Sequence, residues 1–109
     1  MIDWDRVKEL CAEIGADDFA EVVDMFLSEA DEASGRLSPD LSAKAMEADL
    51  HFLKGAALNL GFRALANLCQ EGERRAAAGD TCVDLDAVRD TYQASKVAFD
   101  SGVAQVIAA

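Results

Sequence analysis

The fold of this chain is decided by residues 40–61, which read DLSAKAMEADLHFLKGAALNLG. In an α-helix each residue turns by about 100°, so the apolar side chains opposite His51 make one stripe that must face a core. That stripe is expected to contain Met46, Phe52, Leu53, Ala56, Ala57 and Leu60. Gly61 is a natural end for the helix, because glycine readily adopts the conformation that follows a last helical turn. We therefore expect an amphipathic helix from about Asp40 to Leu60, with His51 near the middle of its exposed face.

The segments on both sides repeat the helical pattern. Apolar residues at spacings of three and four predict further helices over about 4–14, 17–37, 62–79 and 84–106. Asp3 is a suitable N-cap, Gly15 a suitable stop, and Pro39 is expected at or near the first position of the helix that carries His51. No stretch alternates with a period of two for long, and no hairpin dipeptide lies between apolar runs.

Short turns between long helices imply antiparallel neighbours. Residues 1–109 are therefore expected to form a single all-α domain. Its predicted architecture is an antiparallel up-down-up-down four-helix bundle with a short N-terminal capping helix.

Composition restricts the class of partner. A net charge of -11 argues against binding nucleic acid or an anionic membrane surface. The three cysteines are scattered, without metal-ligand spacing, and favour a reducing compartment. The sequence starts without a secretory signal and has no apolar run long enough to span a bilayer. We expect a cytoplasmic protein.

The surroundings of His51, the single histidine, suggest a functional face. The residues within about 60° of it on the helical wheel are Lys44, Glu47, Lys54, Gly55 and Leu58. Lys54 is one turn away and able to reach a group attached to the imidazole. Gly55 leaves open space beside the ring, although glycine costs about 1 kcal/mol in a helix interior. We predict that this face docks a partner, with Leu58 as an apolar contact and Leu50 exposed at its edge.

Imidazole is suited to reversible phosphorylation. Near pH 7 it is largely neutral, so that one nitrogen can attack phosphorus. Transfer then needs in-line geometry and neutralisation of charge on the phosphoryl oxygens, and little else from the carrier. Lys54 is a candidate source of one positive charge.

The stretch from His51 to Gly61 resembles the signature of histidine-containing phosphotransfer domains, H-x-x-K-G-[SA]-[SA]-x-x-[LIV]-G. The likeness continues on the following helix, where Leu65, Cys69 and Glu73 match a recurrent L-x-x-x-C-x-x-[LIVM]-E pattern. Counted from His51 to Glu73, the motif spans about a fifth of the chain.

The resemblance implies a monomeric four-helix bundle that shuttles phosphate between receiver domains in multistep two-component relays. It implies Nε2 of His51 as the phosphorylated atom, Lys54 as its electrostatic helper, and Glu73 as acceptor of a hydrogen bond from the other ring nitrogen. Receiver domains would be the partners, with a hybrid sensor histidine kinase as a further candidate. No cofactor of its own is expected, and Mg²⁺ would come from the receiver. The sequence has no glycine-rich phosphate loop, so we expect a carrier and not an enzyme.

Two residues depart from what the pattern explains. Gly72 stands where relatives usually have an apolar side chain, and either loosens its helix or leaves room under His51. Asp49 lies on the core half of the wheel, and the sequence offers no reason for it.

Three alternatives stay open. Glu73 is also compatible with a surface pair to a Lys or Arg. The same bundle is compatible with a non-phosphorylated interaction module that binds and blocks a receiver or kinase. A metal- or cysteine-dependent enzyme is the weakest alternative, because one histidine and three scattered cysteines do not make a site.

Overall fold

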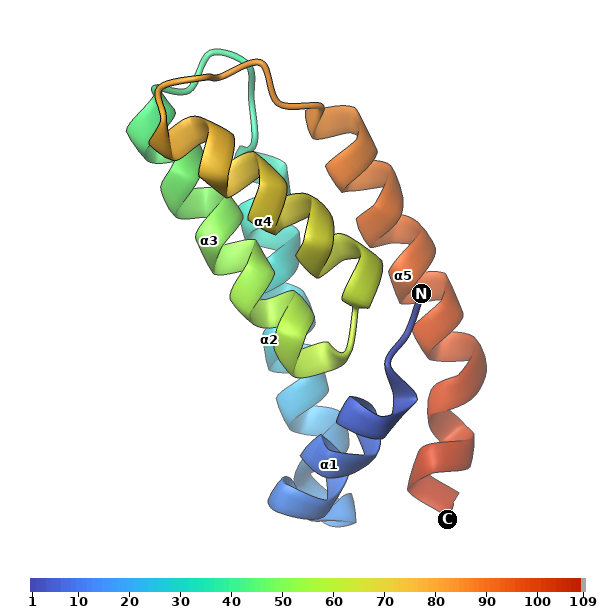
Figure 1. The fold of residues 1–109 in the computed structure, drawn as a ribbon. Coiled ribbons are helices and arrows are strands. Elements are labelled where there is room, and N and C mark those ends of the chain that lie inside the picture. Colours follow the sequence, from blue (N-terminus) through green and yellow to red (C-terminus); the bar gives the residue numbers. More distant parts are fainter. Residues whose placement is uncertain (109) are drawn as a thin grey trace.

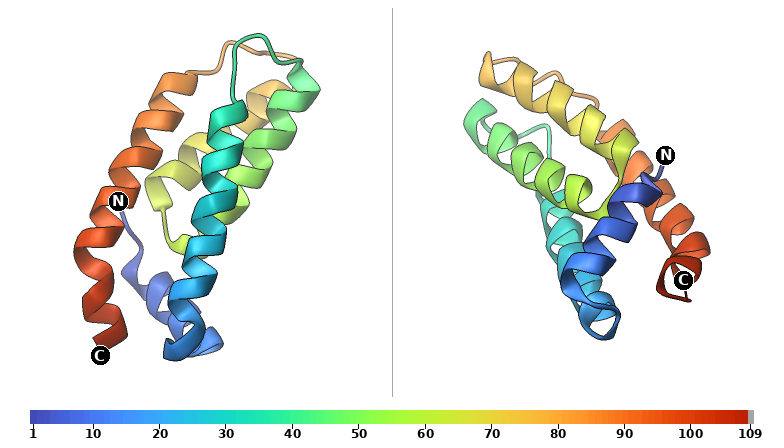
Figure 2. Two further views of the ribbon diagram at one scale, coloured as in Figure 1. Left: turned by 180° about the vertical axis from the view of Figure 1, so that it is seen from behind. Right: turned by 60° about the horizontal axis from the view of Figure 1, so that its bottom comes forward.

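A computed structural model describes residues 1–108, and over that range the chain folds into five α-helices (Figure 1). The helices are α1 (Trp4–Ile14), α2 (Ala16–Arg36), α3 (Ala43–Leu60), α4 (Arg63–Ala77) and α5 (Leu85–Ala108). Helices α2 to α5 run alternately up and down, and the short α1 packs beside the lower ends of α2 and α5 (Figures 1 and 2). The expected all-α bundle with a short N-terminal helix is confirmed. None of the described helices is both long and apolar enough to cross a membrane.

All five helices contribute to one core. Its largest fully buried side chains come from every helix and from the turn before α4; they are Val7, Phe19, Met46, Leu50, Leu53, Leu60, Phe62, Leu65, Val88 and Tyr92. Each such apolar side chain contributes about 1.5–3 kcal/mol when it leaves water. Tyr92 of α5 also donates a hydrogen bond of 2.6 Å to Asp31 of α2, and Lys96 reaches the same carboxylate oxygen at 3.0 Å. These two polar contacts connect α5 to α2 beside the core.

The start of α3 differs from the expectation. The helix begins at Ala43 and not near Asp40, and Pro39 lies in the turn before it. The hydroxyl of Ser42 accepts a hydrogen bond from the backbone N–H of Ala45 at 3.1 Å, which makes Ser42 the N-cap. Ser38 closes the preceding turn, because its carbonyl accepts from the N–H of Leu41. The Ser42 hydroxyl thereby satisfies one of the unpaired N–H groups in the first turn of α3, and Pro39 stays outside the helix.

The rotation of α3 about its own axis is the second correction. Leu50, expected at the exposed edge, is fully buried, whereas Phe52, expected in the core, is 44% exposed. The physical reason lies on α4, where Gly72 has no side chain. A Cβ atom at Gly72 would stand 2.9 Å from Cδ1 of Leu50 and 2.9 Å from Cγ1 of Val83. The space at Gly72 is therefore occupied by Leu50 and Val83, and it does not lie under His51.

Asp49 finds a partner in α2. Its carboxylate lies 3.1 Å from Nε of Arg36, and the aspartate side chain is only 16% exposed. The pair joins the end of α2 to the first half of α3, next to the turn between them. This contact accounts for an acidic residue on the core half of the wheel.

The α3–α4 turn is tied to the N-terminus. Gly61 ends α3 at a φ of +74°, the left-handed conformation, and its carbonyl accepts a hydrogen bond of 2.7 Å from the N–H of Asp3. A Cβ at Gly61 would lie 2.6 Å from the backbone oxygen of Asp3. Asp3 in turn caps α1 through the N–H of Arg6. The expectations that Gly61 ends the helix and that Asp3 is an N-cap are both confirmed.

Replacement of Gly61 by alanine should be more costly than the same change at Gly79. Both glycines have positive φ, +74° and +88°, so each alanine loses about 1–2 kcal/mol from backbone conformation. Only at Gly61 would the new Cβ also collide with backbone, since nothing lies within 4 Å at Gly79. We expect the free energy of unfolding, measured by urea titration, to fall by at least about 1 kcal/mol more for Gly61→Ala. Equal losses would mean that the close approach to Asp3 does not constrain the turn.

Candidate functional site

His51 stands on the solvent side of α3, with 69% of its side chain exposed. Its Nδ1 atom lies 2.7 Å from Oε1 of Glu73 on α4. A carboxylate that is ionised can only accept a hydrogen bond, so Nδ1 must carry the proton. In the neutral ring the lone pair is then on Nε2, the nitrogen that Glu73 does not hold. The expected contact between Glu73 and the imidazole is present, and it leaves the exposed nitrogen nucleophilic.

Lys54 lies against the same carboxylate. Its Nζ is 2.7 Å from Oε2 of Glu73, and both side chains are less than a fifth exposed. The Oε2 atom is buried and has no well-aligned hydrogen bond, so the ion pair with Lys54 compensates its charge. Glu73 thus bridges His51 and Lys54, one residue at each oxygen.

The charges around Glu73 keep it ionised. Burial raises the pKa of Glu73, but the contacts with Lys54 and His51 outweigh burial and lower the pKa of the carboxyl below its ordinary value. A carboxylate that is ionised at neutral pH fixes the ring tautomer described above.

The sequence pattern did not identify Gln70, which also belongs to this cluster. Its Oε1 accepts a hydrogen bond of 3.0 Å from Nζ of Lys54. Gln70 lies one turn before Glu73 on α4, and residues three apart share a helix face. That spacing is the signal that could have placed it beside Lys54.

Cys69 belongs to the core and is fully buried. Burial and the nearby charge of Glu73 raise the pKa of its thiol to about 12, with Lys54 acting in the opposite direction. A thiol with this pKa stays protonated and is a poor nucleophile. Within residues 1–108, no group of three or more His, Cys, Asp or Glu side chains is placed to hold a metal ion.

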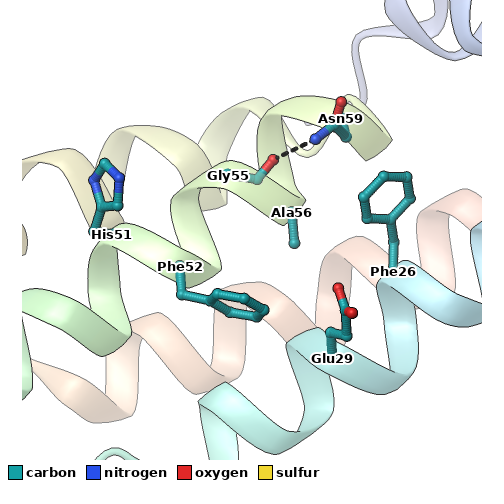
Figure 3. Close-up of a pocket in the computed structure, with 7 residues that line it drawn as sticks. All are labelled: Phe26, Glu29, His51, Phe52, Gly55, Ala56 and Asn59. Carbon is teal, nitrogen blue, oxygen red and sulfur yellow. Dashed lines mark hydrogen bonds between the residues drawn. The ribbon is translucent and has the colours of Figure 1, made fainter.

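A shallow groove runs beside His51 between α2 and α3 (Figure 3). Its volume is about 270 Å³, and its lining residues are Phe26, Glu29, His51, Phe52, Gly55, Ala56 and Asn59. Phe52 and Phe26 project into it from opposite helices (Figure 3). We call the groove formed by these residues the α2–α3 groove. The sequence pattern did not predict this groove, because Phe52 was assigned to the core.

Gly55 is one of the residues that line this groove. A Cβ at Gly55 would meet nothing within 4 Å, so packing within the chain does not require glycine here. Its carbonyl accepts a hydrogen bond of 3.1 Å from the side chain of Asn59. The packing of the fold therefore gives no reason for the cost of glycine in mid-helix, and its use for access to the imidazole stays a prediction.

Of the other residues of the predicted docking face, some are exposed in the structure and one is buried. Lys44 is exposed, Glu47 is partly exposed and Leu58 is 56% exposed, while Leu50 is buried and cannot contact a partner. Leu58 lies toward α4, beside Asn67, on the side of α3 away from the α2–α3 groove. The exposed apolar side chains Phe52 and Leu58 thus lie on two sides of the α3 face that carries His51.

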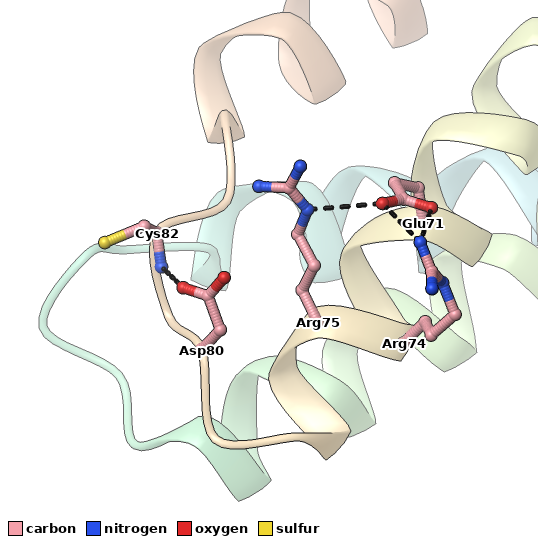
Figure 4. A network of polar contacts seen from close by, with 5 residues as sticks. All are labelled: Glu71, Arg74, Arg75, Asp80 and Cys82. Atoms are coloured by element: carbon pink, nitrogen blue, oxygen red, sulfur yellow. Dashed lines mark hydrogen bonds and ion pairs between the residues drawn. The ribbon is translucent and has the colours of Figure 1, made fainter.

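Arginines near the end of α4 are paired locally. Arg74 contacts Glu71 at 2.6 Å and Arg75 contacts the same carboxylate at 3.2 Å, close to the turn that holds Asp80 and Cys82 (Figure 4). Such exposed pairs contribute little to stability. Their charges are compensated by Glu71, so these arginines give the surface of α4 only a small net positive charge.

Comparison with known proteins identifies the family. The family model described as the Hpt domain matches residues 21–98, which include α3, α4 and the whole His51–Lys54–Gln70–Glu73 cluster. No curated protein and no solved structure matches the chain. Members of this family are phosphocarrier modules that act in histidine phosphotransfer in two-component signalling, with receiver domains and kinases as relay partners. Because the match covers well over half of its length, the chain belongs to the Hpt domain family.

Proposed function

We propose that this protein carries a phosphoryl group on Nε2 of His51 and exchanges it with the aspartate of a response-regulator receiver domain. The observation that supports this most directly is the 2.7 Å contact between Nδ1 and Glu73 on a ring that is 69% exposed. One ring nitrogen is held by the protein, and the other is open to a partner.

The transfer step follows from this arrangement. The Nε2 lone pair forms a bond to the phosphorus of a phosphoaspartate, the P–O bond breaks, and the aspartate leaves as a carboxylate. The ring keeps its Nδ1 proton and becomes positively charged. The Glu73 carboxylate stabilises that charge, in the way that a buried carboxylate stabilises the imidazolium of a catalytic triad. The reverse step returns the phosphoryl group to an aspartate.

Charge on the phosphoryl oxygens is the second requirement. Lys54 supplies a positive charge from the helical turn after His51. Further neutralisation is expected from Mg²⁺ bound by the receiver, because this chain is proposed to need no cofactor of its own. The carrier therefore contributes a nucleophile, an orienting carboxylate and one cation.

The α2–α3 groove is the proposed binding site for a receiver, and Leu58 is proposed as a further contact. The chain has a net charge of -11 and a receiver site is built of carboxylates, so long-range charge opposes the encounter. Apolar burial of Phe52 and Leu58 offers an attraction that does not depend on charge. A hybrid sensor histidine kinase would be a second partner for the same face.

His51→Gln should keep the fold and lose all phosphorylation, because the imidazole is exposed and only the nucleophile is removed. Intact mass after incubation with a phosphorylated receiver measures this, and wild type should gain one phosphoryl group that is lost in acid and kept in alkali. Label on the mutant, or an acid-stable label on wild type, would move the site to another residue. A wild type that binds the receiver without gaining mass would favour the non-phosphorylated interaction module.

Lys54→Met should slow phosphoryl transfer by about tenfold or more while it changes receiver affinity little. The reason is that its charge matters most as the phosphoryl oxygens gain charge in transit. Rapid-quench kinetics at several receiver concentrations separate the maximal rate from the affinity. Lys8→Met is the matched control, since it removes the same charge from an exposed position of α1, outside the face that carries His51. A pure loss of affinity in Lys54→Met would contradict the proposed role.

Phe52→Asp should weaken receiver binding by about tenfold or more, because it places a charge in the apolar contact. The same change at Leu58 should also weaken binding. Val97→Asp is the control, since Val97 is 68% exposed on α5 and does not line the groove. Isothermal titration with a receiver measures all three. Equal affinities for Phe52→Asp and Val97→Asp would place the docking surface elsewhere.

A further inference from the structure

The ammonium of Lys54 is held by α4 in two different ways. Glu73 supplies opposite charge at 2.7 Å, but its Oε2 makes no well-aligned hydrogen bond. Gln70 supplies the directed contact, a hydrogen bond of 3.0 Å from Nζ to its amide oxygen. Charge alone sets how close an ammonium lies, whereas a hydrogen bond also sets how it is turned.

Orientation matters for a group with three N–H donors at the end of a flexible chain. One N–H of Lys54 is directed at Gln70, and the attraction of Glu73 holds the ammonium from another direction. At least one N–H is then free for a phosphoryl oxygen. If the ammonium is already oriented, it does not have to be ordered during the reaction, and preorganised donors stabilise a transition state more than mobile ones.

We propose that Gln70 is a positioning residue for phosphoryl transfer, which acts by orienting the ammonium of Lys54 toward the phosphoryl group on His51. This inference rests on the proposed function of His51. The proposed role belongs to the amide oxygen of Gln70, which accepts from Lys54, and does not involve a contact between Gln70 and a partner protein. The side chain of Gln70 is exposed and has no role in the core.

A small phosphoryl donor tests the site without a docking partner. In the reaction with phosphoramidate, Nε2 of His51 forms the new N–P bond, the P–N bond of the donor breaks, and ammonia leaves with the bonding electrons. The donor nitrogen is already protonated at neutral pH, so no further proton is needed. Changes in this rate report on the His51 cluster and not on receiver binding.

Gln70→Leu removes the acceptor oxygen and keeps a good helix former at an exposed position. We expect phosphorylation of His51 by phosphoramidate, followed by intact mass, to slow by about threefold to tenfold, the range of a single ordinary hydrogen bond. Gln93→Leu makes the same change at an exposed position of α5 and should react at the wild-type rate. Circular dichroism at the assay temperature checks that both variants are folded.

A double-mutant cycle separates positioning from other effects. Because Gln70 is proposed to act through Lys54, Gln70→Leu should cause no further slowing in a Lys54→Met background. Equal slowing in both backgrounds would overturn the inference, and so would a wild-type rate for Gln70→Leu itself. Either result would leave the proposed function intact, as long as wild-type His51 takes up the label. A wild-type protein that gains no phosphoryl group on His51 would overturn the proposed function, and this inference with it.

Discussion

Gly72 of α4 faces Leu50 of α3 without a side chain, and a Cβ there would stand 2.9 Å from the leucine. This close approach brings the two helices together at one defined level and register. The next residue along each helix is His51 on α3 and Glu73 on α4, and their side chains meet at 2.7 Å. The hydrogen bond that sets the imidazole tautomer thus lies directly beside this packing contact. A side chain at position 72 would require Leu50 and Val83 to move, since both already occupy the space beside the glycine.

The contact between Leu50 and Gly72 also affects which side chain lies on the α2 side of His51. Burial of Leu50 against α4 turns α3 so that Phe52 is left on the α2 side, 44% exposed. Phe52 then projects into the α2–α3 groove opposite Phe26 (Figure 3). An orienting carboxylate on one side of the imidazole and an apolar groove on the other are thus two results of one helix rotation.

The sequence predicts those features that depend on one helix at a time. Gly61 as a helix end, Asp3 as a cap and His51 on an exposed face all follow from local spacing and local conformational preference. The rotation of α3 could not be predicted this way, since Leu50 and Phe52 lie about 100° to either side of His51 and the helical wheel treats them alike. In the folded chain Leu50 packs against Gly72 of α4, a contact that the helical wheel does not contain. Gln70 and Phe26 were missed for a related reason, because both enter the site from neighbouring helices.

Glu73 also links the site to the stability of the fold. Its pKa is lowered in the folded protein, so the unfolded chain binds a proton more readily than the folded one. The stabilising effect of the ionised carboxylate is therefore fully present above the ordinary pKa of glutamate, and is lost as the pH falls through the lower, folded pKa. Near neutral pH the carboxylate is ionised and can accept from Nδ1 throughout the proposed cycle. In the proposed cycle the ring becomes cationic when His51 takes up a phosphoryl group, and its attraction to Glu73 would grow as Lys54 is drawn toward the phosphoryl oxygens. One carboxylate can then exchange part of its pairing with the lysine for pairing with the ring, so that its buried oxygens stay compensated in both states.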